Sequence, residues 1–295
     1  MPVKTWNWLH MNSAAVDIPD EIQKNQPIAL TGAPRGNELI VPEMSGEAGE
    51  QEIKLSVDSD TNRTVIIDYN STGSGFMKVR TTAEIAKGGT LKLIEVFRTG
   101  DKYGLTDRVD VKVSEKAGFE LTQIFVRGNE TFTDVKVNLE GRDSALKIDT
   151  AYLTTDDNLL DINYEANHIG ENTMSDISVS GALCDRAEKR FRGTIDFRYG
   201  SSGAKGNELE NVLMLDPDVV NKTIPVILCA EEDVEGNHGA TIGKLDKESM
   251  DYMQSRGLSE EVIRQMMKTA YITSAINRLP DEELKEKLLK EEDLV

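Results

Sequence analysis

The feature that most constrains this chain is a two-residue alternation of apolar and polar side chains, which fills most of the sequence between residues 52 and 243. Successive side chains of a β-strand point to opposite faces of a sheet, so this alternation predicts half-buried strands. Helical periodicity is nearly absent from the same region, and the chain is therefore predicted to be mainly β. The alternating segments are 53–57, 91–93, 109–113, 121–126, 135–139, 146–148, 160–164, 177–179, 194–197 and 226–228.

Turn-forming residues separate the predicted strands, as in Ala86-Lys87-Gly88-Gly89 and Thr155-Asp156-Asp157-Asn158. Many short strands without intervening helices fit a sandwich, a propeller or a stacked β-solenoid. The strands recur at intervals of roughly 10 to 20 residues, which suits a solenoid with two or three strands in each coil. Strand spacing alone leaves the solenoid and the double-sheet sandwich both open.

The pattern changes at residue 244, and residues 244–295 are predicted to form a small α-helical domain. Asp246 is expected to cap a first helix that ends before Gly257. Ser259, followed by two glutamates, is expected to cap a second helix, and Pro280 is expected to open a third. The apolar residues of these helices are Met250, Tyr252 and Met253, then Val262, Ile263, Met266, Met267, Ala270 and Tyr271, then Leu284, Leu288 and Leu289.

The first 51 residues show no regular pattern. They contain Pro19, Pro27, Pro34 and Pro42 and an acidic stretch around residues 43–50. We expect an irregular leader over residues 1–51 that packs on the β body through Trp6 and Trp8. A β core over 52–243 and the helical domain over 244–295 then complete the organisation.

Composition excludes several classes of partner. The chain has 34 basic and 52 acidic residues, for a formal charge of −18. This excess repels nucleic-acid phosphates and anionic lipid surfaces, so neither nucleic acid nor membrane is an expected partner. No run approaches the roughly 18 apolar residues of a membrane span, and the first residues lack the apolar core of a secretory signal. With only two cysteines, reduced thiols and a cytoplasmic location are expected.

One glycine-rich stretch, Gly239-Ala240-Thr241-Ile242-Gly243-Lys244, superficially resembles a phosphate-binding loop. Such a loop needs four residues between its glycines and a hydroxyl side chain after the lysine. Here three residues separate the glycines, and Leu245 follows the lysine. Nucleotide binding is therefore not expected.

The strongest cluster of chemically active residues runs from Cys229 to His238. It places a thiol, four carboxylates and an imidazole within ten residues. Imidazole and thiolate suit iron or zinc, and carboxylates can complete a ferrous site, so His238 and, more weakly, Cys229 are candidate metal or cofactor ligands. The alternative is a buried Cys229 beside an acidic surface loop. The other histidines, His10 and His168, are expected to be solvated turn residues.

Two further sets of residues have alternative interpretations. Alternation places Leu183 inward and Cys184 on the opposite face, where an exposed thiol could react, although no nearby histidine supports nucleophilic catalysis. The helical methionines, Met250, Met253, Met266 and Met267, are expected in a core. Their second interpretation is an adaptable docking surface, because methionine conforms to different partners.

Three segments together resemble the SufB/SufD family, whose members are scaffold subunits of the SUF iron-sulfur cluster assembly complex. These are Arg190-Phe191-Arg192-Gly193-Thr194-Ile195, Asn211-Val212-Leu213-Met214-Leu215, and the run from Leu228 through His238-Gly239-Ala240-Thr241-Ile242-Gly243 to Ser255-Arg256-Gly257-Leu258. The resemblance covers residues 180–280 and implies a right-handed parallel β-helix followed by a helical domain. It selects the solenoid among the folds left open above.

The resemblance also implies a role. The last β coils would pair with a SufB-type chain, and residues 244–295 would dock the SufC ATPase, so this chain would not itself be an enzyme. Gly239 after His238 is SufD-like, because SufB-type chains have a glutamate there. His238 is then a candidate for the site of the nascent cluster at the subunit interface. No counterpart of the sulfur-accepting SufB cysteine is present, so no stable cluster is expected on this chain alone.

Two alternatives compete with the SufD-like scaffold. The chain could pair with a second copy of itself as a minimal homodimeric scaffold, although it lacks the sulfur-accepting cysteine. It could also be an acidic β-helix enzyme that acts on carbohydrate, with coil faces that present carboxylates for calcium binding or acid/base catalysis. The helical tail and the absence of a secretory signal weaken this second alternative.

Overall fold

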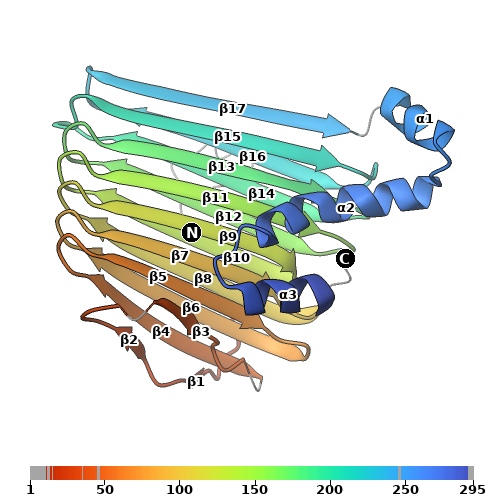
Figure 1. The fold of residues 1–295 in the computed structure, drawn as a ribbon, viewed down its shortest axis with the longest axis horizontal. Helices are drawn as coiled ribbons and strands as arrows, with labels where there is room; N and C mark the ends of the chain where they lie inside the picture. Colours follow the sequence, from red (N-terminus) through yellow and green to blue (C-terminus); the bar gives the residue numbers. More distant parts are fainter. Residues whose placement is uncertain are drawn as a thin grey trace.

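A computed structural model gives the fold and describes residues 11, 14, 16–34, 36–44, 47–244 and 247–291. Its strands alternate between two sheets, and every neighbouring pair in the described sheets is parallel. Each coil contributes one strand to each sheet, which produces a parallel β-solenoid of about eight turns (Figure 1). The predicted mainly-β solenoid with C-terminal helices is confirmed.

The two sheets are named A and B. Sheet A contains β4 (Ala48–Val57), β6 (Ser74–Ile85), β8 (Lys102–Val113), β10 (Glu130–Leu139), β12 (Leu159–His168), β14 (Glu188–Phe197) and β16 (Val220–Cys229), with the short strands β1 (Gln23–Lys24) and β2 (Ile28–Leu30) against β4. Sheet B contains β3 (Asn37–Ile40), β5 (Asn62–Asn70), β7 (Thr90–Arg98), β9 (Gly118–Arg127), β11 (Ala145–Thr154), β13 (Met174–Leu183), β15 (Ala204–Met214) and β17 (Val234–Lys244).

The apolar residues of the alternating pattern fill the inside of this solenoid. Residues such as Val109, Val135 and Tyr164 stack in register on successive strands of sheet A, and all three are fully buried. Their outward neighbours are polar and form ladders between coils, as in the ion pair of Lys136 with Glu165. Because every coil covers the inner side chains of the next, one continuous core runs along the body.

Three helices follow the solenoid: α1 (Lys247–Ser255), α2 (Glu260–Ile276) and α3 (Glu282–Glu291). Figure 1 shows α2 and α3 lying across one face of the body, while α1 lies beyond the end of β17. No helix among the described residues is long and apolar enough to cross a membrane.

The predicted helix boundaries are largely confirmed. Ser259 caps α2 and accepts a hydrogen bond from the backbone N–H of Val262. Gly257 has a φ of +91°, the left-handed conformation that favours glycine after a helix. Asp281 accepts from the N–H of Leu284 at the start of α3. Asp246, Trp6, Trp8 and His10 lie outside the described residues.

The helices explain why several strands of sheet B are apolar on both faces. The outward residues of β5, β7 and β9 form a second core with α2 and α3 instead of facing water. Its buried members are Ile66, Ile94, Val96, Ile124 and Val126 from the sheet and Ile272, Ala275, Ile276, Leu279, Leu284 and Leu288 from the helical tail. The tail is thus part of the folded body rather than a detachable appendage.

The methionines do not behave as one core group. Met266 is 51% exposed, so its expected core position is wrong. Met250, Met253 and Met267 are half-buried, and Met267 packs beside Cys184. Met266 faces solvent because α2 turns its opposite side towards sheet B.

Candidate functional site

His238 lies in the middle of β17, the last strand of sheet B, which pairs with β15. Two glycines show which way its side chain projects. A Cβ on Gly236 would approach Ile227 inside the solenoid at 3.3 Å, whereas a Cβ on Gly239 would approach the outward-facing Leu209. His238 is therefore on the inner face of the last coil. It is exposed because no further coil covers it within the described chain.

Cys229 ends β16 and also lies on the inner face of the last coil, but it is not beside His238. Its thiol is exposed and donates a hydrogen bond to the carbonyl of Glu231 at 3.0 Å. Ile227 lies opposite Gly236 across the interior. Cys229 lies two residues from Ile227, towards the turn between β16 and β17, whereas His238 lies two residues from Gly236, away from that turn. With a rise of about 3.3 Å per residue, this separates them by about 13 Å along the strands. The structure does not combine the thiol and the imidazole into one site.

The carboxylates between them are used mainly in turns and surface ion pairs. Glu231 accepts from the backbone N–H of Gly200 in the preceding turn at 3.0 Å. Glu235 pairs with Lys205 at 2.9 Å on the outer surface of sheet B. Across the described ranges, no group of three or more His, Cys, Asp or Glu side chains is placed to hold a metal. Glu231 and Glu235 are thus engaged away from His238, in the turn and on the outer face.

A different carboxylate lies next to His238. Glu208 of β15 is its partner in register and is only 3% exposed. Burial and the negative charge of Glu210 raise the pKa of Glu208 to about 8, while Lys189 acts in the opposite direction. Glu208 occupies the space left by a missing side chain, because a Cβ on Gly193 of β14 would overlap its carboxylate.

Glu208 belongs to a buried charged layer one coil inward from His238. Lys189 and Glu210 form an ion pair that is almost fully buried, and Thr223 hydrogen-bonds to both, at 3.1 and 2.8 Å. Burial lowers the pKa of Lys189 despite the negative charge of Glu210. Next to this layer, the hydroxyl of Tyr152 has no hydrogen-bond partner in the described structure. The inside of the solenoid is thus polar close to its open end.

The motif Arg190-Phe191-Arg192-Gly193 forms the middle of β14. Arg192 makes a buried two-contact ion pair with Asp161 of β12, and Phe191 packs edge-on against Tyr164 inside the body. This motif therefore binds one coil to the next on both faces of sheet A.

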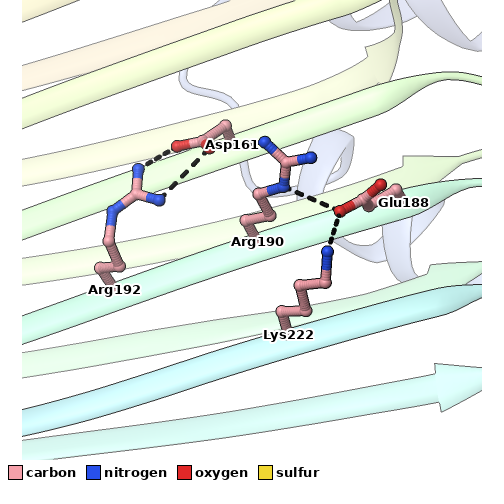
Figure 2. A network of polar contacts seen from close by, with 5 residues as sticks. All are labelled: Asp161, Glu188, Arg190, Arg192 and Lys222. Atoms are coloured by element: carbon pink, nitrogen blue, oxygen red, sulfur yellow. Dashed lines mark hydrogen bonds and ion pairs between the residues drawn. The ribbon is translucent and has the colours of Figure 1, made fainter. Parts of the chain in front are cut away.

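Figure 2 shows the outward arginines of this motif within a network that spans β12, β14 and β16. Arg190 and Lys222 both donate to the same oxygen of Glu188, at 2.8 and 2.7 Å. Together with the Arg192–Asp161 pair, these contacts hold the last coil in register with the coils before it.

The expected position of His168 is wrong. It is fully buried, and its two ring nitrogens contact the hydroxyls of Thr173 and Ser175 at 2.7 and 2.8 Å. Its ring lies 4.8 Å from that of Phe197, and burial lowers its pKa to about 4. His168 ends β12 at an inward position, so the next coil covers it.

The expected exposure of Cys184 is also wrong. The thiol does lie on the face opposite Leu183, but Met267 and Tyr271 of α2 pack over its cluster. It is fully buried, and this burial raises its pKa to about 12. A thiol in this environment is a small core residue, not a nucleophile.

The buried residues Glu208 and Glu210 were not identified from the sequence. The alternation around Leu209 suggests that the leucine faces inward, yet Leu209 is 42% exposed. Val212 is a buried core residue and shows which face of β15 points inward. Glu210 and Glu208 lie two and four residues before it, so they share its inward face.

Comparison with known families gives the class of the protein. Residues 43–271 match the family described as "SUF system FeS cluster assembly, SufBD core domain". This match spans the solenoid from β4 onward and reaches into α2, so the chain belongs to the SufBD core-domain family of the SUF iron-sulfur cluster assembly system.

Individual relatives agree with the family. The chain is 22% identical over 270 residues to the iron-sulfur cluster assembly protein SufD of Bacillus subtilis, an alignment covering 85% of this chain and 62% of that protein. It is 25% identical over 156 residues to SufD of Escherichia coli, covering 53% and 37%. Over 183 residues it is 24% identical to the chloroplastic SufBD family protein ABCI8 of Arabidopsis thaliana, covering 62% and 33%. The chain thus spans at most about three fifths of the length of these relatives.

Proposed function

We propose that this chain is a SufD-like scaffold subunit that pairs with a SufB-type chain and docks a SufC-type ATPase. The observation that carries this proposal is the end of the last coil, which no described part of the chain covers and where His238 is accessible on the inner face of β17. The family and the SufD relatives support it. The family also favours a scaffold over a carbohydrate-active enzyme.

The last coil has the features of a pairing surface. In the described sheets, β16 and β17 each pair on one side only, so both present an unpaired backbone edge. Apolar side chains near this end are exposed, with Val220 at 38%, Leu209 at 42% and Ile242 at 51%. Unpaired edges and apolar side chains suit addition of strands from another chain. We infer that a SufB-type chain covers this end, and that a second copy of this chain is the competing occupant.

His238 would face the iron-sulfur cluster that is assembled at this interface. Its imidazole would offer a nitrogen lone pair to iron from this chain's side of the interface. Cys184 is buried and Cys229 lies about 13 Å along the strands from His238, so one copy does not supply a four-thiolate cage. The cluster is therefore cargo shared with the partner, and we expect no stable cluster on this chain alone.

The helical tail would supply the surface for the ATPase. Tyr252 of α1 is 59% exposed, and Val262 and Met266 of α2 are 44% and 51% exposed. Val262 and Met266 are four residues apart and so share one side of α2. Exposed aromatic and methionine side chains on a helical face are typical anchors for a protein partner.

Replacing His238 with Ala tests the proposed site. His238 is exposed at the open end, so its removal should change the stability of the chain by no more than about 1 kcal/mol. The variant should still bind SufB-type and SufC-type partners, yet fail to restore cluster assembly in cells that lack this gene. The matched control is Asn237→Ala, on the adjacent exposed position of β17, which should restore assembly. Restoration at the normal rate by His238→Ala would refute the role of this residue.

Partner choice at the open end is tested by light scattering of the purified chain alone and with a SufB-type chain. We expect a one-to-one complex with the SufB-type chain, disrupted by Ile242→Lys on β17. A stable homodimer that excludes the SufB-type chain would instead support the minimal homodimeric scaffold. Iron and sulfide in stoichiometric amounts in the isolated protein would contradict the expectation of no stable cluster.

ATPase docking is best tested by surface substitutions. Removing residues 248–295 would expose the second core on sheet B, including Ile94 and Ile124, so loss of binding could reflect damage to the body. The combined variant Tyr252→Ser, Val262→Ser and Met266→Ser leaves that core intact. We expect at least a tenfold loss of SufC affinity with no loss of SufB binding. Unchanged SufC affinity would refute this docking surface.

A further inference from the structure

The in-register pair of His238 and Glu208 has a geometry that a shared metal ion would fit. The two residues are direct partners on the neighbouring parallel strands β17 and β15. Neighbouring strands lie about 4.8 Å apart, and partners in register project to the same face. The side chains of His238 and Glu208 therefore leave the backbone next to each other on the inner face of the solenoid, His238 at its open end and Glu208 one strand deeper.

The carboxylate of Glu208 has no hydrogen bond or ion pair in the part of the chain that the structure describes, although its residue is only 3% exposed. The neighbouring Glu210 is different, because Lys189 and Thr223 both contact its carboxylate. A buried carboxylate without a partner is costly. The charge of Lys189 acts on Glu208, but Lys189 is paired with Glu210, so a cation at the open end would be a direct partner for the Glu208 carboxylate.

The space for Glu208 depends on a glycine on the opposite sheet. Gly193 of β14 lies across the interior from Glu208, and a Cβ at this position would overlap the carboxylate. The register partner of Gly193 on the last strand of sheet A is Pro225, and neither residue has a polar side chain. The polar atoms directed to this point of the interior therefore come mainly from sheet B, from Glu208 and His238.

We propose that Glu208 and His238 together bind one divalent transition-metal ion, of the class of Fe²⁺, at the open end of the last coil. This inference rests on the proposed function for the role of His238 and extends the site by one residue, inward to Glu208. An imidazole with a carboxylate is a donor pair suited to ferrous iron. The open side of the coil leaves the remaining coordination positions to water, or to donors of whatever chain covers this end.

The experiment is an anaerobic titration of the purified 295-residue chain with Co²⁺, a spectroscopic substitute for Fe²⁺, followed by its visible absorption. The wild-type chain should bind one equivalent. Glu208→Gln keeps the shape of the side chain and cannot ionise, so it should fold, and it should weaken Co²⁺ binding at least tenfold. His238→Ala should weaken binding to a similar extent.

The matched control is Glu235→Gln, which removes a carboxylate from the same strand as His238 but from its outer face. It should bind Co²⁺ as the wild type does. Equal affinity in all four proteins would mean adventitious binding to an acidic surface and would overturn the proposal. Unchanged affinity in Glu208→Gln alone would overturn it as well.

A second measurement does not depend on any variant. Paramagnetic Co²⁺ broadens NMR signals close to it, so one equivalent should broaden the amide signals of Glu208 and His238 before that of Cys229. Broadening centred on Cys229 would overturn the proposal.

The proposed function can fail independently of this site. Tight Co²⁺ binding that needs both residues, combined with normal cluster assembly by His238→Ala, would uphold the metal site and refute the scaffold role of His238. Absence of Co²⁺ binding combined with failed assembly by His238→Ala would overturn the metal site and leave the proposed function standing.

Discussion

Gly193 and Glu208 face each other across the inside of the solenoid, and the carboxylate of Glu208 occupies the volume that a side chain on Gly193 would need. Gly193 is not among the described glycines with positive φ, so backbone conformation does not require a glycine there. Space does. The glycine of the Arg-Phe-Arg-Gly motif thus has a steric role that becomes visible only when β14 and β15 are placed in adjacent sheets.

This relationship predicts the effect of adding one methyl group. Gly193→Ala should lower the free energy of unfolding by about 1–3 kcal/mol, because the new Cβ forces Glu208 out of a closely packed interior. Combining it with Glu208→Ala should recover most of that loss, since the overlapping atoms are removed. Urea denaturation of the two single variants and the double variant measures the coupling. An equal loss with and without Glu208 would show that the steric explanation is wrong.

Arg98, a buried cation on the outer face of sheet B, has two carboxylate partners whose removal should lower the free energy of unfolding by different amounts. Arg98 of β7 is 1% exposed and makes two hydrogen bonds to Asp68 of β5, at 2.8 and 2.7 Å, and a third to Glu291 of α3. The Asp68 side chain is 3% exposed, whereas that of Glu291 is 47% exposed. Asp68→Asn leaves a buried guanidinium without its main counter-charge and should cost about 3–5 kcal/mol.

The matched variant, Glu291→Gln, removes a partner that water can replace. It should change the free energy of unfolding by less than about 1 kcal/mol. Thermal or urea unfolding of the two variants provides the comparison. Equal effects would mean that the position of α3, rather than the buried pair, determines the contribution of Arg98.

The strands and helix caps of this fold can be predicted from the sequence, but the burial of outward-facing residues cannot. Alternation identified the strands because an inner face is apolar whichever way the coils stack. The caps at Ser259 and Gly257 were readable because they depend on a few neighbouring residues. Whether another element covers an outward-facing side chain does not depend on neighbouring residues in the sequence. Cys184 lies on the outward face as alternation predicts, but it is buried because α2, far along the chain, packs over that face.

The candidate site shows the same division. His238 could be identified from the residues around it, whereas its partner Glu208 is 30 positions earlier in the chain and becomes its neighbour only through the register of β15 with β17. A register of this kind follows from the length of a full coil, turns included. Successive coils differ in that length, since Val109 pairs with Val135 but Gly193 pairs with Pro225. Spacing in the sequence therefore did not lead to Glu208.

A pair of interior carboxylates predicts how stability changes as the pH rises towards neutral. Glu95 and Asp107 are fully or almost fully buried, and Tyr69, Gln123 and Thr133 surround them with hydrogen bonds. Burial raises the pKa of Glu95 from 4.5 to about 7, and burial together with the charge of Glu95 raises that of Asp107 well above its usual value.

The sign of the effect follows from proton binding. Between pH 4.5 and pH 7 the folded chain holds more protons at Glu95 than the unfolded chain, so stability contributed by this group falls as pH rises through that window. Glu95→Gln cannot ionise, and its stability relative to the wild type should therefore improve between pH 5 and pH 8, by on the order of 2 kcal/mol. Urea denaturation at the two pH values measures this difference. A constant difference would contradict ionisation of Glu95 in this window.

His168 predicts a change of the opposite sign on the acid side. Its ring is fully buried between Thr173, Ser175 and Phe197, and burial lowers its pKa from 6.5 to about 4. As pH falls from 6.5 towards 4, the unfolded chain gains a proton at this residue that the folded chain does not accept, so the free energy of unfolding decreases. The contribution of His168 should fall by about 2 kcal/mol between pH 7 and pH 5.

The wild-type profile alone does not isolate this contribution, because Glu95 stabilises the fold as pH falls over part of the same window. The comparison is therefore between the wild type and His168→Gln, whose amide can still hydrogen-bond to Thr173 and Ser175 but does not titrate. His168→Gln should be less stable than the wild type at pH 7, where the contact with Phe197 is lost, and the gap should narrow or reverse at pH 5. Urea denaturation at both pH values measures the gap. A gap that stays constant would show that His168 titrates alike in the folded and unfolded chain, and so is open to water.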